Sequence, residues 1–163
     1  MLFRSMLLGG VFKSTGNQSP VVVAAKAAYM NDDLERFAKR YGVPFRFNPH
    51  FPINTLALMR GAVAYQADAV VSSTYRDAIF TAIWVEGQNL NELDVIGQVL
   101  TDAGLDPAEL MDRIGQQTVK DQLIANTEQA VDRGVFGAPT FFVGDQMFFG
   151  QDRLDFVTEA LSG

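Results

Sequence analysis

Two short apolar runs near the C-terminal end of the chain constrain the fold most. Residues 140–143 (Thr-Phe-Phe-Val) and 146–149 (Gln-Met-Phe-Phe) are rich in aromatic and β-branched residues and flank Gly144-Asp145. Such a two-residue connection is typical of a tight β-hairpin. The fold must therefore contain a sheet, although most of the chain before the hairpin has helical spacing.

The long segment before the hairpin is predicted to be helical. Ser19-Pro20 indicates a helix start, and Gly42 followed by Pro44 indicates its end. Asp106-Pro107 opens a later helix. Other helices are expected to stop at Gly87, Gly104 and Gly134.

The N-terminal apolar run, Leu2 to Leu8, ends at Gly9-Gly10 and is interpreted as one β-strand. A loop over residues 13–19 is expected to follow it. A single strand separated from a hairpin by about a hundred helical residues suggests an α/β sheet with a helical insertion.

Composition and charge exclude several classes of function. The net charge is −6 and the 13 Lys and Arg residues are scattered, so nucleic acid is not expected as a partner. The chain has no cysteine, which excludes a disulfide framework and a thiolate metal site. A single histidine, His50, cannot build a multi-histidine metal site and is interpreted as a surface or loop residue. Since no apolar run is long enough to span a bilayer, we expect a cytoplasmic protein without a membrane partner.

The sequence Gly-Ala-Pro-Thr at residues 137–140 leads directly into the hairpin. Proline cannot donate a ladder hydrogen bond, so Pro139 belongs at an edge or at the first position of a strand. With a cis bond at Ala138-Pro139, the N–H and carbonyl of Ala138 would point outward, where an extended peptide can pair with them. From the local sequence alone, an ordinary loop with a trans proline is the alternative, because only about 5–6% of X–Pro bonds are cis.

These motifs together resemble a known family. Gly-Ala-Pro-Thr, the Phe-rich hairpin and residues 150–153 (Gly-Gln-Asp-Arg) are similar to the C-terminal half of thioredoxin-fold proteins. More narrowly, the chain resembles the 2-hydroxychromene-2-carboxylate isomerases and kappa-class glutathione transferases, which have a DsbA-like thioredoxin fold. The resemblance covers essentially the whole chain and continues through residues 6–13, 15–17, 26–30 and 51–55.

The resemblance implies an α/β fold with a thioredoxin-like sheet and a large all-helical insertion. Residues 1–20 and 136–163 would form a partial thioredoxin-like domain that lacks its first strand and helix. Residues 21–135 would form the helical insertion domain. The resemblance also implies that the Ala138-Pro139 bond is cis.

It further implies that glutathione lies along Ala138-Pro139, with its γ-glutamyl end at Gln151 and Asp152. Asp152 can accept a hydrogen bond from the ligand's α-ammonium group, and N–H groups at a helix start favour its α-carboxylate. From the residue alone, Asp152 is interpreted first as a helix N-cap, and the two roles are compatible.

Four further residues are candidates on the same grounds. Asn17 matches a family position that hydrogen-bonds glutathione, and Lys26 matches a basic position that can face the glycyl carboxylate. Phe12 and Trp84 are candidates for the wall of an aromatic-substrate pocket. The alternatives are a turn residue for Asn17, a solvated helix surface for Lys26, and core packing for Phe12 and Trp84.

The absence of cysteine excludes a disulfide oxidoreductase, which needs a Cys-X-X-Cys pair. A glutathione-dependent isomerase needs no protein thiol, because the ligand brings the sulfur. In the family, a serine hydroxyl at a helix N-terminus lowers the pKa of that thiol. The strand and helix that carry this serine, on the order of 30 residues, correspond to sequence upstream of Leu2. We therefore name no catalytic residue and no metal ligand in this chain.

Two functions follow as alternatives. The first is a glutathione-dependent cis–trans isomerase of the 2-hydroxychromene-2-carboxylate type, acting on a small aromatic substrate in aromatic-compound degradation, as a homodimer. The second is a non-catalytic thioredoxin-like remnant that binds glutathione or a protein partner. Because the family's serine segment has no match here, we expect a poor catalyst that associates through the free edge of strand 2–8.

Overall fold

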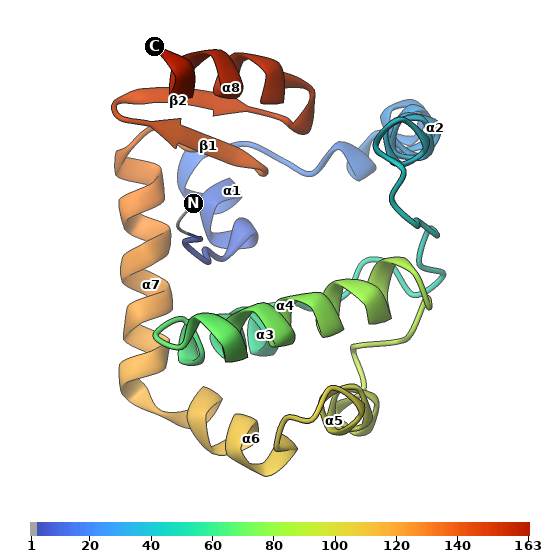
Figure 1. Ribbon diagram of the computed structural model, residues 1–163, viewed down its shortest axis with the longest axis vertical. Helices are drawn as coiled ribbons and strands as arrows, with labels where there is room; N and C mark the ends of the chain where they lie inside the picture. The colour runs from blue at the N-terminus through green and yellow to red at the C-terminus, as the bar shows by residue number, and fades with distance from the viewer. Residues whose placement is uncertain (1–2) are drawn as a thin grey trace.

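The structure is a computed structural model and describes residues 3–163. Helix α7 runs along one side of the molecule and connects the lower helices α5 and α6 to the hairpin and α8 at the top (Figure 1). Helices α3 and α4 cross the middle, and α2 stands apart on the far side. The elements are α1 (Leu8–Thr15), the 3-10 turn η1 (Pro20–Val22), α2 (Ala24–Tyr41), α3 (Leu56–Ala64), α4 (Ala69–Trp84), α5 (Leu93–Asp102), α6 (Pro107–Gly115), α7 (Gln117–Asp132), β1 (Thr140–Val143), β2 (Gln146–Phe149), the 3-10 turn η2 (Gln151–Arg153) and α8 (Leu154–Ser162).

The hairpin forms where the sequence predicts it. Strands β1 and β2 pair antiparallel, with Thr140 opposite Phe149 and Val143 opposite Gln146. Gly144 has a φ of 57°, a left-handed conformation that glycine adopts without steric cost. The two strands form a two-stranded sheet, and α8 packs against β1.

The glycine-marked helix ends are confirmed, whereas Ser19-Pro20 opens the 3-10 turn η1 and α2 itself begins at Ala24. The Ser19 hydroxyl accepts a hydrogen bond from the Val21 N–H at 3.5 Å, at the start of η1. Gly42 follows α2 with a φ of 66° and donates its N–H back to the last turn of that helix. The glycines expected to stop the later helices all have positive φ, namely Gly87, Gly104 and Gly134.

The largest core lies among α3, α4, α5 and α6. Leu58, Tyr75, Leu100 and Leu110 are each at most 4% exposed there. The Tyr75 hydroxyl donates to the carbonyl oxygen of Leu58 at 2.9 Å, so the buried phenol is satisfied. Burial raises the pKa of Tyr75 well above its ordinary value, and it also raises the pKa of Tyr65.

A buried asparagine anchors the extended segment between α2 and α3 to the end of α4. The Asn48 side-chain amide donates to the carbonyl oxygens of Ile83 at 2.9 Å and Gln88 at 2.8 Å. Its oxygen accepts from the His50 N–H at 2.7 Å. The His50 side chain is exposed, as expected. The Phe51–Pro52 bond in this segment is cis, which the sequence did not indicate.

The predicted strand Leu2–Leu8 is wrong. Leu2 lies outside the described residues, residues 3–7 form no strand, and Leu8 begins α1. The segment packs against α7 instead, where the Leu7 N–H donates to the Thr127 hydroxyl at 3.0 Å.

Helix α1 continues through Gly9-Gly10 because its packing needs a small residue there. A Cβ on Gly10 would lie 3.1 Å from the Thr127 methyl carbon, and the neighbouring Val11 is fully buried. This tertiary contact outweighs the low helix propensity of glycine. Residues 3–8 therefore offer no free strand edge, and association through that edge loses its basis.

Within the described residues, every helix is too short or too polar to cross a membrane.

Candidate functional site

The peptide bond between Ala138 and Pro139 is cis, as the family resemblance implied. Both residues are exposed at the entrance of β1. The neighbouring polar groups are already bonded: the Gly150 N–H donates to the Pro139 carbonyl at 3.0 Å, and the Thr140 hydroxyl donates to the Gly137 carbonyl at 2.8 Å.

Ala138 differs from these neighbours. In residues 3–163, neither its N–H nor its carbonyl oxygen has a hydrogen-bond partner. Unpaired main-chain groups at the entrance of a strand are suited to pairing with an extended peptide. The segment can therefore bind a short peptide through backbone hydrogen bonds.

Asn17 lies beside this segment. Its side-chain amide donates to the carbonyl oxygen of Phe136 at 2.8 Å, and its side-chain oxygen accepts from the Gln18 N–H at 2.8 Å. The amide keeps one further N–H and one further lone pair for a ligand. Asn17 therefore acts as a turn residue and also joins the loop after α1 to the loop before Ala138.

Gln151 and Asp152 follow the hairpin directly, in η2. Gly150, whose N–H bonds to Pro139, has a φ of 102° and leads directly into η2. The Asp152 carboxylate is exposed and accepts from the Arg153 guanidinium at 2.6 Å. Neither η2 nor α8 has a side-chain cap hydrogen bond, so the interpretation of Asp152 as a plain N-cap is wrong.

A small cavity of about 120 Å³ lies between the end of α2 and the start of α8. The Tyr41 hydroxyl bridges its two sides by donating to the Gln151 carbonyl at 3.1 Å. Arg40 and Tyr41 were not identified from the sequence. The signal available was their position in the last turn of α2, just before Gly42, but the sequence does not indicate which element that turn meets. The cavity is lined by Phe37, Arg40, Tyr41, Gln151, Asp152, Leu154 and Asp155.

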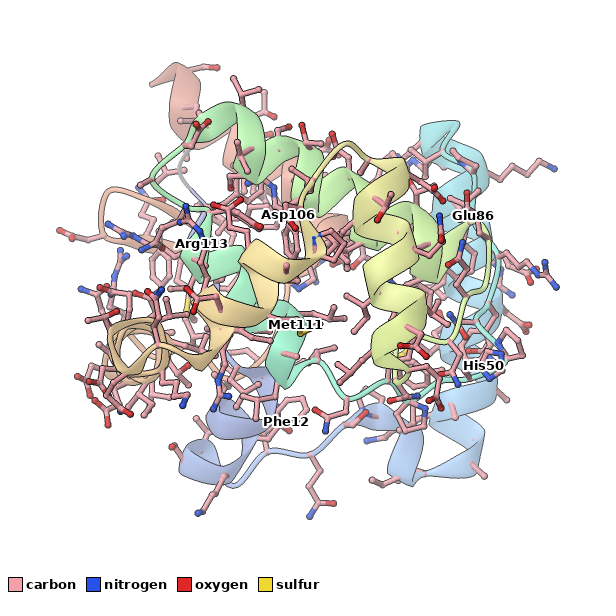
Figure 2. The ribbon with its side chains drawn as sticks, turned by 90° about the horizontal axis from the view of Figure 1, so that it is seen from below. Phe12, His50, Glu86, Asp106, Met111 and Arg113 are labelled. Atoms are coloured by element: carbon pink, nitrogen blue, oxygen red, sulfur yellow. The ribbon has the colours of Figure 1, made fainter. Side chains whose placement is uncertain are left out.

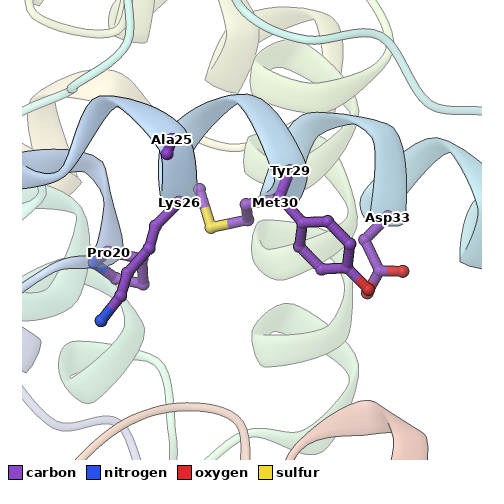
Figure 3. A pocket seen from close by; sticks show the side chains of 6 residues that line it. All are labelled: Pro20, Ala25, Lys26, Tyr29, Met30 and Asp33. Atoms are coloured by element: carbon purple, nitrogen blue, oxygen red, sulfur yellow. The ribbon is translucent and has the colours of Figure 1, made fainter.

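Lys26 lies at a different place from these residues. It is exposed on α2 beside an open cavity of about 430 Å³, to which Tyr29 and Asp33 also contribute (Figure 3). Within the described residues, no hydrogen bond or ion pair joins Lys26 to Asn17 or Asp152. Its role toward the glycyl carboxylate stays a prediction.

Phe12 and Trp84 are both half-buried and come from separate parts of the fold. Phe12 lies on α1, well separated from His50 (Figure 2). Trp84 ends α4, and its ring packs among three phenylalanines with centroid distances of 5.9 to 6.4 Å. This packing matches the alternative interpretation of Trp84. A substrate contact stays a prediction for both residues.

An aromatic pair at the site was missed by the sequence analysis. The ring centroids of Phe136 and Phe149 are 4.6 Å apart, and the two side chains are 38% and 42% exposed. They approach closely because Gly137 lacks a Cβ, which would lie 2.8 Å from the Phe149 ring. The hairpin register was the available signal, since it places Phe149 opposite Thr140. The pair supplies an exposed apolar surface next to Ala138.

Comparisons with known proteins place this chain in a family. The family model for DSBA-like thioredoxin domains matches residues 1–162. The 2-hydroxychromene-2-carboxylate isomerase of Sphingobium xenophagum is 34% identical over 152 residues, which cover 91% of this chain and 75% of that protein. For the enzyme of the same name from Pseudomonas sp. (strain C18) the identity is 31%, covering 85% and 64%. Rat glutathione S-transferase kappa 1 is 27% identical, covering 97% and 76%.

A solved structure of a 2-hydroxychromene-2-carboxylate isomerase has a similar fold. It matches with a TM-score of 0.80 at 28% identity, covering 96% of this chain and 77% of the other. The chain thus spans between 64% and 77% of the length of these relatives.

Proposed function

We propose that this chain, which belongs to the DSBA-like thioredoxin family and groups there with the 2-hydroxychromene-2-carboxylate isomerases and kappa-class glutathione transferases, binds glutathione at Ala138-Pro139. We further propose that it uses glutathione in the cis–trans isomerisation of a small aromatic compound. The names of its relatives support the reaction class.

The single observation that carries the proposal is the free main-chain edge of Ala138. Ala138 is exposed and its N–H and carbonyl have no partner within residues 3–163; Asn17 bonds to Phe136 just before it, and Gly150, which precedes Asp152 by two residues, bonds to Pro139 just after it. An extended tripeptide with charged ends fits such a site, because its backbone can pair with Ala138 while its amino group meets a carboxylate. The donor and acceptor set of the site is therefore compatible with glutathione.

Each residue of the site has a distinct part in this proposal. When bound, glutathione would supply a thiol whose deprotonated form can add to a conjugated carbon and leave it again. Ala138 would fix the direction of the ligand backbone, and Asp152 would accept a hydrogen bond from its ammonium group in exchange for Arg153. The exposed rings of Phe136 and Phe149 would exclude water and stack on an aromatic substrate.

Binding without catalysis is the second candidate function. Two of the hydroxyls near Asn17 and Pro139 donate to backbone carbonyls: Thr15 to Val11 at 2.9 Å, and Thr140 to Gly137 at 2.8 Å. Neither is therefore free to donate to a ligand thiolate. This arrangement favours a protein that holds glutathione without activating its sulfur.

A turnover assay distinguishes the two functions. Isomerisation of a hydroxychromene carboxylate is followed by absorbance with glutathione, with S-methylglutathione, and with neither. An isomerase converts the substrate only with glutathione, because the methylated analogue lacks the free thiol. Binding of glutathione without turnover would support the second function, and no binding of either compound would contradict both.

Homodimerisation is part of the proposal. Helix α2 has no buried residue; Tyr29 on α2 is 63% exposed, and Val22 in η1 just before it is 64% exposed. Exposed apolar side chains grouped on one helix often mark an interaction surface. A mass from light scattering twice that of the chain would support a dimer, and the monomer mass would contradict it.

A cytoplasmic location is likewise proposed, and fractionation of the host cells tests it.

A further inference from the structure

Helix α2 has one face that no other helix or strand of residues 3–163 covers. None of its 18 residues is buried, and the helix stands apart from the others (Figure 1). Among the described elements, it packs most closely against the short turn η1. Most helices in proteins are stabilised by packing of an apolar face, so α2 is expected to have a partner outside this chain.

Four residues define this face, which we call the α2 stripe: Lys26, Tyr29, Met30 and Asp33. Positions three, four and seven apart lie on one side of a helix. All four line the open cavity of about 430 Å³, and Lys26, Tyr29 and Asp33 project from the same side of α2 (Figure 3). Every residue that lines this cavity belongs to η1 or α2. The cavity is therefore a groove along one helix, with its opposite side open.

The α2 stripe has a basic end, an apolar centre and an acidic end. Lys26 and Asp33 lie two turns apart, about 10 Å along the helix axis, so they are too distant to pair with each other. Tyr29 and Met30 lie midway between them. Among the ion pairs of residues 3–163, none involves Lys26, and Asp33 pairs only with Arg36, at 3.7 Å. A second stripe in the reverse direction would therefore place an acid opposite each base.

We infer that the α2 stripe is the contact surface between two copies of this chain, with the two α2 helices antiparallel about a two-fold axis between Tyr29 and Met30. In this register Lys26 faces Asp33 of the partner subunit, and Tyr29 packs on Met30 of the partner subunit. The same contacts recur on the other side of the axis, because a two-fold interface repeats each contact. A parallel pair of helices would instead bring like charges together. The inference rests on the homodimer proposed above and defines its interface.

Charge reversal tests the antiparallel register. Lys26→Glu would place carboxylates opposite each other at both ends of the interface, and Asp33→Lys would place ammonium groups there. Each variant alone should raise the Kd of the dimer at least about tenfold, because like charges that face each other across an interface repel strongly. Sedimentation velocity over a range of protein concentrations measures this Kd.

An equimolar mixture of the two variants should dimerise again. In the mixed dimer, the new acid of one variant faces the new base of the other, and the native Lys26 and Asp33 face each other at the second end. The Kd should therefore return to within about threefold of the native value. A parallel arrangement does not predict this recovery, since the reversed positions would then face native residues that differ from their antiparallel partners.

Glu35→Lys and Lys39→Glu are the matched controls, because they reverse the same charges on the opposite side of α2. Both should dimerise as the native chain does. None of the four substituted residues is buried, so all four variants should keep the native circular dichroism spectrum.

The outcomes separate the inference from the proposed function. A native chain that stays monomeric contradicts both the homodimer and this interface. A native dimer that Lys26→Glu and Asp33→Lys leave intact contradicts the interface alone, and so does a mixture of the two variants that stays monomeric. Weaker glutathione binding by Lys26→Glu with an unchanged dimer would assign Lys26 to the ligand, which overturns the inference and leaves the glutathione site standing.

Discussion

The side-chain amide of Asn17 donates a hydrogen bond to the carbonyl oxygen of Phe136 at 2.8 Å, although the two residues are 119 positions apart. This bond ties the loop after α1 to the segment that presents Ala138. Asn17 therefore positions the proposed binding edge, whether or not it also touches the ligand.

Asn17→Ala is expected to weaken glutathione binding about two- to tenfold, because it removes one hydrogen bond worth about 0.5–1.5 kcal/mol. The cause is the lost bond to Phe136, together with any direct contact to the ligand. Titration calorimetry measures the change. Gln18→Ala, the neighbouring exposed amide, is the control, and an equal loss in both variants would contradict a specific role for Asn17.

Gly61→Ala and Gly97→Ala are expected to change the free energy of unfolding in opposite directions. A Cβ on Gly61 would clash with the buried Tyr75 phenol and lie 2.9 Å from a Leu110 methyl carbon. Overpacking of this kind costs about 1–3 kcal/mol. A Cβ on Gly97 meets only Pro107, at 3.8 Å, so alanine should stabilise α5 by about 0.5–1 kcal/mol. Urea unfolding measures both, and a stable Gly61→Ala variant would show that the core of α3 and α4 is looser than described.

Stability should fall at alkaline pH because of the buried tyrosines. Burial raises the pKa of Tyr75 and Tyr65 above the ordinary value of 10.0. As the pH rises past about 10, the unfolded chain loses these phenol protons while the folded chain keeps them, so the free energy of unfolding decreases. Urea unfolding at about pH 8 and about pH 11 tests this. Tyr75→Phe should reduce the decrease, and an unchanged slope in Tyr75→Phe would refute the assignment.

Asn48→Ala is expected to destabilise the chain by about 3 kcal/mol, because it leaves buried backbone groups without partners. The residue is fully buried, and its side chain makes three hydrogen bonds. The loosened segment carries Phe45, Phe47 and Phe51, which pack on Trp84, so the emission of this single tryptophan should shift to longer wavelength. Asn31→Ala on the surface helix α2 is the control and should leave the emission unchanged.

Features fixed by local chemistry could be predicted from the sequence. The hairpin and its register follow from Gly144-Asp145 between two apolar runs, and the helix ends follow from glycine. The conformation of residues 2–8 could not be predicted from local chemistry, because a short apolar run fits a strand or a helix equally well. The contact of Gly10 with Thr127 decides between them, and it joins residues far apart in sequence.

In the candidate site, too, residues of contiguous motifs could be predicted and residues brought together by tertiary contacts could not. Ala138, Pro139, Gln151 and Asp152 belong to contiguous motifs, so the family resemblance could predict them as site residues. The Phe136–Phe149 pair and the position of Arg40 at the cavity between α2 and α8 depend on which elements meet in space. They could therefore not be predicted from the sequence. The boundaries between the two predicted parts, 1–20 with 136–163 and 21–135, stay a prediction, and limited proteolysis tests them.

Titration of the native 163-residue chain with glutathione tests the central claim most directly, alongside Asp152→Ala and the control Glu159→Ala on α8. The native chain and the control should bind glutathione equally, because Glu159 lies in the C-terminal half of α8 and does not line the cavity at Asp152. Asp152→Ala should bind more weakly by about 1.5–3 kcal/mol, the usual contribution of a hydrogen bond to a charged group. No binding by the native chain, or equal binding by Asp152→Ala, would contradict the site at Ala138, Pro139 and Asp152.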